Sequence, residues 1–551
     1  MEGEQKLRAL SDEYFDFYVE SYPEMATVVG VHTFDDRLTC YDRASLDHQV
    51  RTLREFKKQA EELLCAGNLS VTASVDARLL ASSSEMQVLE IEKMMKPWLD
   101  PTLYIEVSLY GLFLLVSREV VPIEKRAHSV AGRLKEFARV LAEARQNLEN
   151  PPSVFTTTAI GMLKGADAFI KETISYLGEQ VPQARSELES SSRICIGAMR
   201  DFETYLENDL LPRSNGDFAI GRDLFETKLR VQHMLDIDTK TLEKMGRRLL
   251  LETREQIENL SNELHPGRNW KDVVEALKEN HPDASQLRGE YEKHMRKAKE
   301  FVLSKNLVPI PAGEELRVID TPSFERGTIP YAAYVHPGSL DEKQEGLFFV
   351  TPVDTSAPIE VQRDQLRGHS YAAMVLTALH EGYPGHHLQL VHSNRVPVKL
   401  RHLCGNTVFA EGWALYCEEL MKEVGFYESR EIEIFQLKDM LWRAARVVVD
   451  VGLHTRSMSF DEAVEFLISE ALIERPNAMA EIRRYTNSPS QPSSYAIGKA
   501  EVLALREEER QRLGARFNLA KFHQKLLSSG TIPFKLVKEE FRAKDQDSAE
   551  K

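Results

Sequence analysis

"SYAAMVLTALHEGYPGHHLQL", residues 370–390, decides how the fold of this chain is interpreted. Its first ten residues are mostly apolar, which predicts a buried helix that delivers His380 and Glu381 at its end. Pro384 follows, and a proline lacks the backbone donor and clashes with the carbonyl four residues earlier. We therefore expect the helix to end, kink or bulge at residues 383–385. Such a bulge would return His386 to the helix face that carries His380.

Histidines are concentrated around this break: six of the sixteen lie between residues 369 and 402. In the His-Glu-x-x-His motif, two histidines four residues apart bind zinc from one helix face, and the glutamate is the general base. A proline occupies the place of the second histidine here. We therefore predict His380 and His386 as ligands and Glu381 as the base. His387 is the alternative second ligand if the helix runs straight, and otherwise a residue that supports a ligand by a hydrogen bond.

A third ligand is expected from a neighbouring helix, because a catalytic zinc takes three protein ligands and keeps one position for water. The segment "NTVFAEGWALYCEELMKEVG" (406–425) carries Glu411 among apolar residues, which indicates an inward carboxylate. A buried carboxylate needs a partner, and a cation is one. Glu418 lies seven residues later on the same face and is placed to accept a hydrogen bond from a ligand histidine. We predict one Zn2+ per chain, held by His380, His386 and Glu411.

The rest of the chain predicts a mostly α fold, because apolar residues recur at three- and four-residue steps in long segments. Examples are 46–67, 131–152 and 239–264. Proline, glycine and β-branched residues dominate 306–360, where we expect a small hairpin or sheet near the active-site cleft. Its strand "EGLFFVTPV" (345–353) is a candidate for backbone pairing with an extended peptide. We predict an N-terminal helical lobe at 1–305 and a catalytic, metal-binding lobe at 306–551, packed as one unit.

Composition excludes several classes of protein. A net charge of −16 over 551 residues disfavours binding to nucleic acid or to anionic membranes, which would repel the chain. The longest apolar run, "YGLFLLV" (110–116), is too short to cross a bilayer. Five scattered cysteines without a CxxC pair, and a charged N-terminus without an apolar core, predict a reduced, cytoplasmic protein.

Several motifs together resemble the family known as domain of unknown function 885, whose members are similar to helical gluzincin metallopeptidases. The resemblance covers nearly the whole chain in order. It rests on "HEGYPGHH" (380–387), "FAEGWALY" (409–416), "PEMATVVGVHTFDDRL" (23–38), "RVVVDVGLH" (446–454) and "RYTNSPSQPSSYAIG" (484–498). The chain departs from the family pattern at Val451, Ser490 and Pro492, and none of these is a proposed ligand. The resemblance implies a mostly helical, zincin-like fold with zinc held by two histidines and a glutamate.

The resemblance also implies two residues that stabilise the oxyanion of amide hydrolysis. These are His454, with Asp450 four residues earlier on the same helix to orient it, and Tyr495, which follows a Ser- and Pro-rich loop. An inward-facing arginine would bind a substrate carboxylate and make the protein a carboxypeptidase or dipeptidase. The candidates for substrate binding are Arg443, Arg446, Arg483 and Arg484, with Arg484 favoured, together with Gln491.

The predicted function is zinc-dependent hydrolysis of peptide or small amide substrates, with short peptides favoured. Two alternatives are an amidase that acts on non-peptide amides and a non-catalytic helical protein that binds a metal or a peptide. Retention of Glu381 argues against the non-catalytic alternative, because a structural metal site needs no base. A di-iron or di-manganese enzyme is disfavoured, since no histidine has a glutamate three residues before it. A serine hydrolase is unsupported because the chain has no GxSxG motif.

Overall fold

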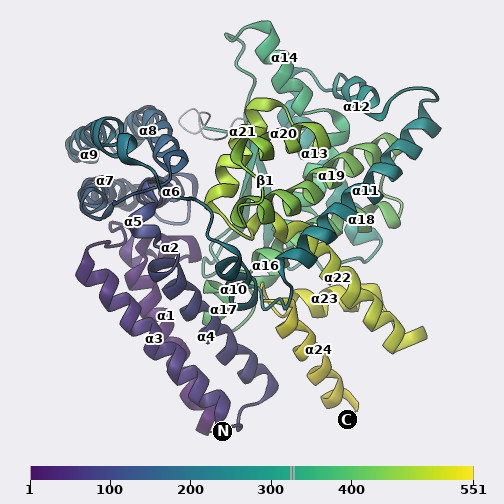
Figure 1. Ribbon diagram of the computed structural model, residues 1–551, viewed down its shortest axis with the longest axis horizontal. Coiled ribbons are helices and arrows are strands. Elements are labelled where there is room, and N and C mark those ends of the chain that lie inside the picture. Colours follow the sequence, from purple (N-terminus) through teal and green to yellow (C-terminus); the bar gives the residue numbers. More distant parts are fainter. Residues whose placement is uncertain (1, 323–325, 327–328, 330, 550–551) are drawn as a thin grey trace.

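The computed structural model describes residues 2–549 except 323–325, 327–328 and 330. The predicted mostly α class is confirmed (Figure 1). Helices make up most of the chain, both before and after one small sheet in the sequence. The helices before the sheet are α1 (Glu2–Ser21), α2 (Pro23–Val29), α3 (Arg43–Cys65), α4 (Val71–Glu92), α5 (Lys96–Leu99), α6 (Pro101–Ser117), α7 (Ile123–Asn147), α8 (Ser153–Gln180), α9 (Arg185–Tyr205), α10 (Arg222–Gln232), α11 (Thr239–Leu264), α12 (Trp270–Lys278) and α13 (Leu287–Ser304). The helices after the sheet are α14 (Ile359–Gly368), α15 (Tyr371–Thr377), α16 (His386–Ser393), α17 (Lys399–Leu403), α18 (Thr407–Glu423), α19 (Arg430–His454), α20 (Phe460–Ala471), α21 (Arg475–Asn487), α22 (Gln491–Leu513), α23 (Leu519–Leu527) and α24 (Phe534–Ala549).

Helix boundaries follow local capping as well as periodicity. The side chain of Asp42 accepts a hydrogen bond from the Ser45 amide at the start of α3, and Asp238 does the same for Thr241 at the start of α11. Such side chains satisfy amides that have no partner inside the helix. The apolar face of α3 is buried, as its three- and four-residue spacing predicts.

The sheet has three strands, β1 (Glu314–Asp320), β2 (Ala332–Val335) and β3 (Gln344–Val350), in the order β1-β3-β2. The expected small sheet is confirmed, although part of the predicted segment 306–360 lies outside the described residues. β1 pairs with β3 in parallel and β2 pairs with β3 in antiparallel orientation, so the sheet is more than a hairpin. Because β3 is the central strand, both of its edges are used. The prediction that segment 345–353 pairs with a peptide is therefore wrong.

The apolar cores mix distant parts of the chain. One cluster joins Leu10 and Tyr14 of α1 with residues as far along as Phe541 of α24. A second cluster, formed mainly by α6–α9, lies along one side of the molecule (Figure 1). A third joins α11 and α12 to α19–α21. The division into lobes at residue 305 stays a prediction, and the first cluster crosses that boundary.

Within the described residues, no single helix is long and apolar enough to cross a bilayer, while the pair Val71–Leu99 and Pro101–Ser117, bent by 95°, meets the length and composition criteria only jointly.

Candidate metal centre

The helix break forms where the sequence predicts it. α15 continues into a π-helical turn, Ala378–Gly382, which carries His380 and Glu381, and α16 begins at His386. The chain returns so closely that a Cβ atom on Gly385 would lie 1.9 Å from the carbonyl oxygen of His380. The indole of Trp413 in α18 donates a hydrogen bond to the carbonyl of Pro384 over 2.9 Å. The break is therefore fixed by glycine on one side and by α18 on the other.

Three predicted ligands converge beside this break. Oε2 of Glu411, from α18, lies 3.2 Å from Nε2 of His386 and 3.7 Å from Nε2 of His380. The two imidazole rings are 4.8 Å apart and nearly perpendicular, at 86°. In a tetrahedral zinc site with bonds of about 2.1 Å, donor atoms lie about 3.4 Å apart. The two distances from Glu411 are therefore compatible with donor atoms that share one ion.

The chemistry of the donor set also fits a divalent cation. Oε2 of Glu411 is buried and has no hydrogen-bond partner among the described residues. Burial by itself raises the pKa of Glu411, but His380 and His386 outweigh it and hold that pKa well below its ordinary value. Burial lowers the pKa of His380, and the carboxylates of Glu411 and Glu418 outweigh it and raise that pKa to about 10. Without a metal, a proton on His380 therefore balances the carboxylate of Glu411, and a bound cation would take the place of that proton.

Two carboxylates are near enough to compete for the third ligand position. Donor atoms of His380, Glu381 and His386 all lie within 4.8 Å of one another. The geometry favours Glu411, because its buried Oε2 has no hydrogen bond within the described residues and lies within 3.7 Å of both Nε2 atoms. Glu381 then remains as a carboxylate beside the centre, where a general base is required.

Glu418 and His387 have different environments. Oε1 of Glu418 accepts a hydrogen bond from Nδ1 of His380 over 2.8 Å. His387 is fully buried, with Nε2 2.6 Å from Oε2 of Glu314 and Nδ1 3.1 Å from the hydroxyl of Tyr334. Because both nitrogens are engaged with other groups, the prediction of His387 as an alternative ligand is wrong. The break turns its ring toward the sheet, away from the face that His386 presents.

The network around Glu314 was not found from the sequence. Its carboxylate also accepts from the hydroxyl of Tyr383 over 2.7 Å and pairs with Nζ of Lys299 over 2.6 Å. Burial alone raises the pKa of Glu314, but His387, Lys299 and Tyr383 outweigh it and lower the pKa to about 2. The sequence does place an acidic pair, Glu314 and Glu315, at the start of a strand candidate, yet nothing in the spacing links it to a histidine more than seventy positions later.

Tyr495 lies beside the ligands on α22. Its ring stacks on that of His380 with centroids 6.4 Å apart and planes at 18°. Burial raises the pKa of Tyr495, and the carboxylate of Glu411 raises it further. α22 approaches α18 closely at Gly412 and Gly498, where an added Cβ atom would meet the opposite backbone at 2.3 Å and 1.9 Å. The backbone contact brings the phenol and the carboxylate together.

The predicted pair of His454 and Asp450 is arranged differently. Nε2 of His454 donates to the carbonyl of Tyr485 over 3.0 Å and lies 3.9 Å from Asp450, beyond hydrogen-bonding distance. Asp450 instead accepts from the amides of Ser490 and Ser493 and from the Ser493 hydroxyl. The prediction that Asp450 orients His454 is therefore wrong. His454 is fully buried, and burial lowers its pKa to about 4, so the structure holds it as a neutral residue of the interior.

The predicted substrate-binding residues are paired with other groups. Arg484 is exposed and donates to Gln491 over 2.9 Å and to Glu481 over 2.8 Å. Arg446 is buried and donates to the hydroxyl of Tyr485 over 2.6 Å. Its guanidinium lies 4.5 Å from the ring centroid of Tyr495. The structure thus brings Arg446 to the centre through Tyr495, while Arg484 and Gln491 bind each other.

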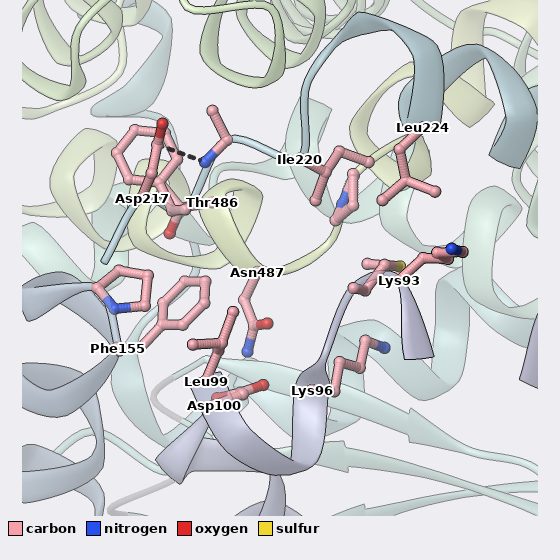
Figure 2. A pocket seen from close by; sticks show the side chains of 15 residues that line it. Lys93, Lys96, Leu99, Asp100, Phe155, Asp217, Ile220, Leu224, Thr486 and Asn487 are labelled. Atoms are coloured by element: carbon pink, nitrogen blue, oxygen red, sulfur yellow. Dashed lines mark hydrogen bonds between the residues drawn. The ribbon is translucent and has the colours of Figure 1, made fainter. Parts of the chain in front are cut away.

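A separate pocket of about 160 Å3 is lined in part by Pro489, which precedes α22, and Figure 2 shows its side chains. Lys96 and Asp100 contribute to its lining, together with Thr486 and Asn487 of α21. None of the predicted ligands contributes to its wall. Asp100 accepts hydrogen bonds from Thr102, and Lys96 pairs with Glu90, so these charges are compensated within the chain.

The fold has close counterparts among solved structures. A candidate lipoprotein of unknown function from Shewanella oneidensis is 24% identical, with a TM-score of 0.80 over 97% of this chain and 99% of that one. Another, from Colwellia psychrerythraea, is 19% identical, with a TM-score of 0.83 over 98% and 99%. At these identities the likeness shows the fold alone. No curated protein matches the sequence.

A family model described as "Bacterial protein of unknown function (DUF885)" matches residues 23–541. This span includes the helix break, α18 and the helices that carry His454 and Tyr495. It agrees with the resemblance that the motifs imply. The chain belongs to the DUF885 family of bacterial proteins of unknown function.

Proposed function

We propose that the protein is a zinc-dependent hydrolase of peptide or other amide bonds, on a zincin-like helical fold. The observation that carries this proposal is the buried Oε2 of Glu411, which has no hydrogen bond within the described part of the chain and lies 3.2 Å and 3.7 Å from Nε2 of His386 and His380. In a purely structural network, buried polar atoms complete their hydrogen bonds. A buried carboxylate oxygen that lies near two imidazoles without a hydrogen bond therefore supports a cation as its partner. Glu381 beside the same atoms supports a catalytic site over a structural one.

Each residue has a role that follows from its position. Zinc, when bound, would polarise the substrate carbonyl and lower the pKa of a water molecule. Glu418 accepts the Nδ1 proton of His380, so in the neutral ring the lone pair is on Nε2, the nitrogen 3.7 Å from Oε2 of Glu411. Glu381 takes the proton of the attacking water on its carboxylate and passes it to the departing amine nitrogen. The hydroxyl of Tyr495 donates to the carbonyl oxygen as negative charge develops there.

Of the two predicted oxyanion donors, Tyr495 is retained and His454 is not. Tyr495 stacks on a ligand ring and is half-buried, which supports a role for its hydroxyl beside a substrate bound at the centre. His454 is fully buried, and its Nε2 proton is already donated to a backbone carbonyl. Short peptides are the substrate class that we propose, in line with the similarity of the motifs to those of gluzincins.

The test combines metal analysis with digestion of a mixed peptide library, read by mass spectrometry, with and without a chelator. We expect about one zinc per wild-type chain and cleavage that the chelator abolishes. Glu411→Ala should lose the zinc, while Glu423→Ala, at the exposed end of the same helix, should keep it. Glu381→Gln should keep the zinc and lose cleavage by about 10²- to 10⁴-fold. Equal zinc content in wild type and Glu411→Ala would contradict the ligand set, and an active Glu381→Gln would contradict the base.

A further inference from the structure

The two sides of the helix break bind one oxygen atom. Tyr383 precedes the Pro384–Gly385 pair and His387 follows it. The hydroxyl of Tyr383 and Nε2 of His387 both donate to Oε2 of Glu314, over 2.7 Å and 2.6 Å. The side chains of Glu314 and His387 are 1% and 0% exposed. A single carboxylate on β1 therefore fixes the distance between the chain segments before and after the break.

The ring of His387 is held on its remaining sides. The hydroxyl of Tyr334, on β2, lies 3.1 Å from Nδ1. Because Nε2 donates its proton to the carboxylate, Nδ1 of the neutral ring accepts from that hydroxyl. A Cβ atom on Gly346, in β3, would lie 2.6 Å from Nδ1, so only a glycine lets the central strand pack against the ring. All three strands thus contact the residue that follows His386.

Contacts from outside supplement the backbone of the break, where the amide of Gly385 donates to the carbonyl of Leu379 over 3.0 Å. Pro384 has no amide proton, and the regular helical bonds are interrupted between the π-helical turn and α16. His380 lies before the break and His386 begins the helix after it, yet both must direct Nε2 at the same point. The angle between the two segments therefore decides whether the ligands meet.

We propose that Glu314 is a positioning residue of the metal centre, which holds His386 at the distance from His380 and Glu411 that zinc requires. This inference rests on the proposed function, since it takes zinc to be the occupant. Lys299, 2.6 Å from the other carboxylate oxygen, compensates the buried charge of Glu314. Groups that support metal ligands from outside the coordination sphere change metal affinity by about 10- to 100-fold when they are replaced.

The test measures the zinc dissociation constant of the full chain by competition with a chromophoric chelator. Glu314→Gln replaces one acceptor oxygen with an NH2 group, which opposes the protons of Tyr383, His387 or Lys299. We expect its dissociation constant to rise about 10- to 100-fold. Tyr383→Phe removes only one hydroxyl. We expect its zinc dissociation constant to rise by about 3- to 10-fold, less than in Glu314→Gln. The visible spectrum of the cobalt(II)-loaded variants should change, because the angle between the ligands changes.

Two controls separate positioning from general destabilisation. Glu315→Gln changes the adjacent, exposed residue of β1 and should leave the dissociation constant unchanged. Glu540→Gln breaks a buried pair with Arg401, of 2.6 Å, outside the centre, and should lower thermal stability without changing zinc affinity. Wild-type affinity in both Glu314→Gln and Tyr383→Phe would overturn the positioning role alone, and if Glu314→Gln does not fold, Tyr383→Phe decides. A wild-type chain that binds no zinc would overturn the proposed function as well.

Discussion

Nδ1 of His380 donates to Oε1 of Glu418, 38 residues later in the chain, over 2.8 Å. In the neutral imidazole that a metal ligand requires, the one proton lies on Nδ1 in this bond, and Nε2 is left unprotonated. Nε2 is the atom that faces Oε2 of Glu411. Glu418 thus sets both the tautomer and the direction of a ligand that it supports from behind.

Glu418→Gln should weaken zinc binding by about 10-fold, because a neutral amide makes the imidazole a poorer donor to the metal and no longer selects the tautomer. The dissociation constant from chelator competition measures this. Glu419→Gln is the matched control, since Glu419 pairs with Lys499 and Gln436 and not with a histidine. Equal affinities in the two variants would argue against the support role.

Tyr495→Phe should lower kcat by about 10²-fold and leave KM nearly unchanged, because its hydrogen bond strengthens only in the transition state. Zinc content should stay at the wild-type value. Steady-state kinetics on a peptide identified from the library measures both constants. Tyr110→Phe, at an exposed position on α6, is the control. A raised KM with an unchanged kcat would make Tyr495 a substrate-binding residue instead.

Gly385→Ala should abolish zinc binding, because the new methyl group would lie 1.9 Å from the backbone oxygen of His380 and force the two segments apart. Gly405→Ala is the control, since nothing lies within 4 Å of the atom it adds. Metal analysis and circular dichroism on both proteins separate a local change at the break from loss of the fold. A zinc-loaded Gly385→Ala protein would show that the close return is dispensable.

His32→Gln should reduce stability at pH 6 more than at pH 9. The imidazole contacts Asp35 over 2.9 Å and Asp341 over 3.1 Å. Burial lowers the pKa of His32, but the two carboxylates outweigh it and raise the pKa to about 9. A raised folded-state pKa gives stability that is complete below the unfolded value of about 6.5 and is lost as the pH rises to about 9.

We expect the difference in unfolding free energy between wild type and His32→Gln to be on the order of 2 kcal/mol at pH 6, after allowance for solvent screening, and to shrink toward pH 9. Urea denaturation at pH 6, 7.5 and 9 measures it. His48→Gln, at an exposed position on α3, controls for the loss of an imidazole. A difference that does not change with pH would show that the ion pairs with Asp35 and Asp341 contribute nothing.

The fold was predictable where it depends on local patterns. Segments 46–67 and 239–264 correspond to α3 and α11, since amphipathic spacing and capping residues act within a few positions. Which strands pair, and in which direction, was not predictable from such local patterns. The parallel pairing of β1 with β3 joins residues 30 positions apart, and the intervening chain carries no signal for it. For that reason, the sequence did not predict that β3 is the central strand, and the expected pairing of segment 345–353 with a peptide was wrong.

The candidate site divides in the same way. The proline after Glu381 predicts the break, and the break explains why His386 faces Glu411. The part of the site that depends on contacts across the fold was missed. Glu314 is 73 residues from His387, and Asp450 binds the turn before α22 instead of His454. Such partners are selected by tertiary packing, which a single sequence does not display.

At the contact between Gly412 and Gly498, the backbones of α18 and α22 meet with no side chain between them. A change of side-chain rotamer cannot alter the distance between the two helices there, so the distance between Glu411 and Tyr495 is fixed by backbone contact. We therefore expect that moderate heating does not separate Glu411 from Tyr495 gradually. They should part together, in the same cooperative event that pulls the two helices apart.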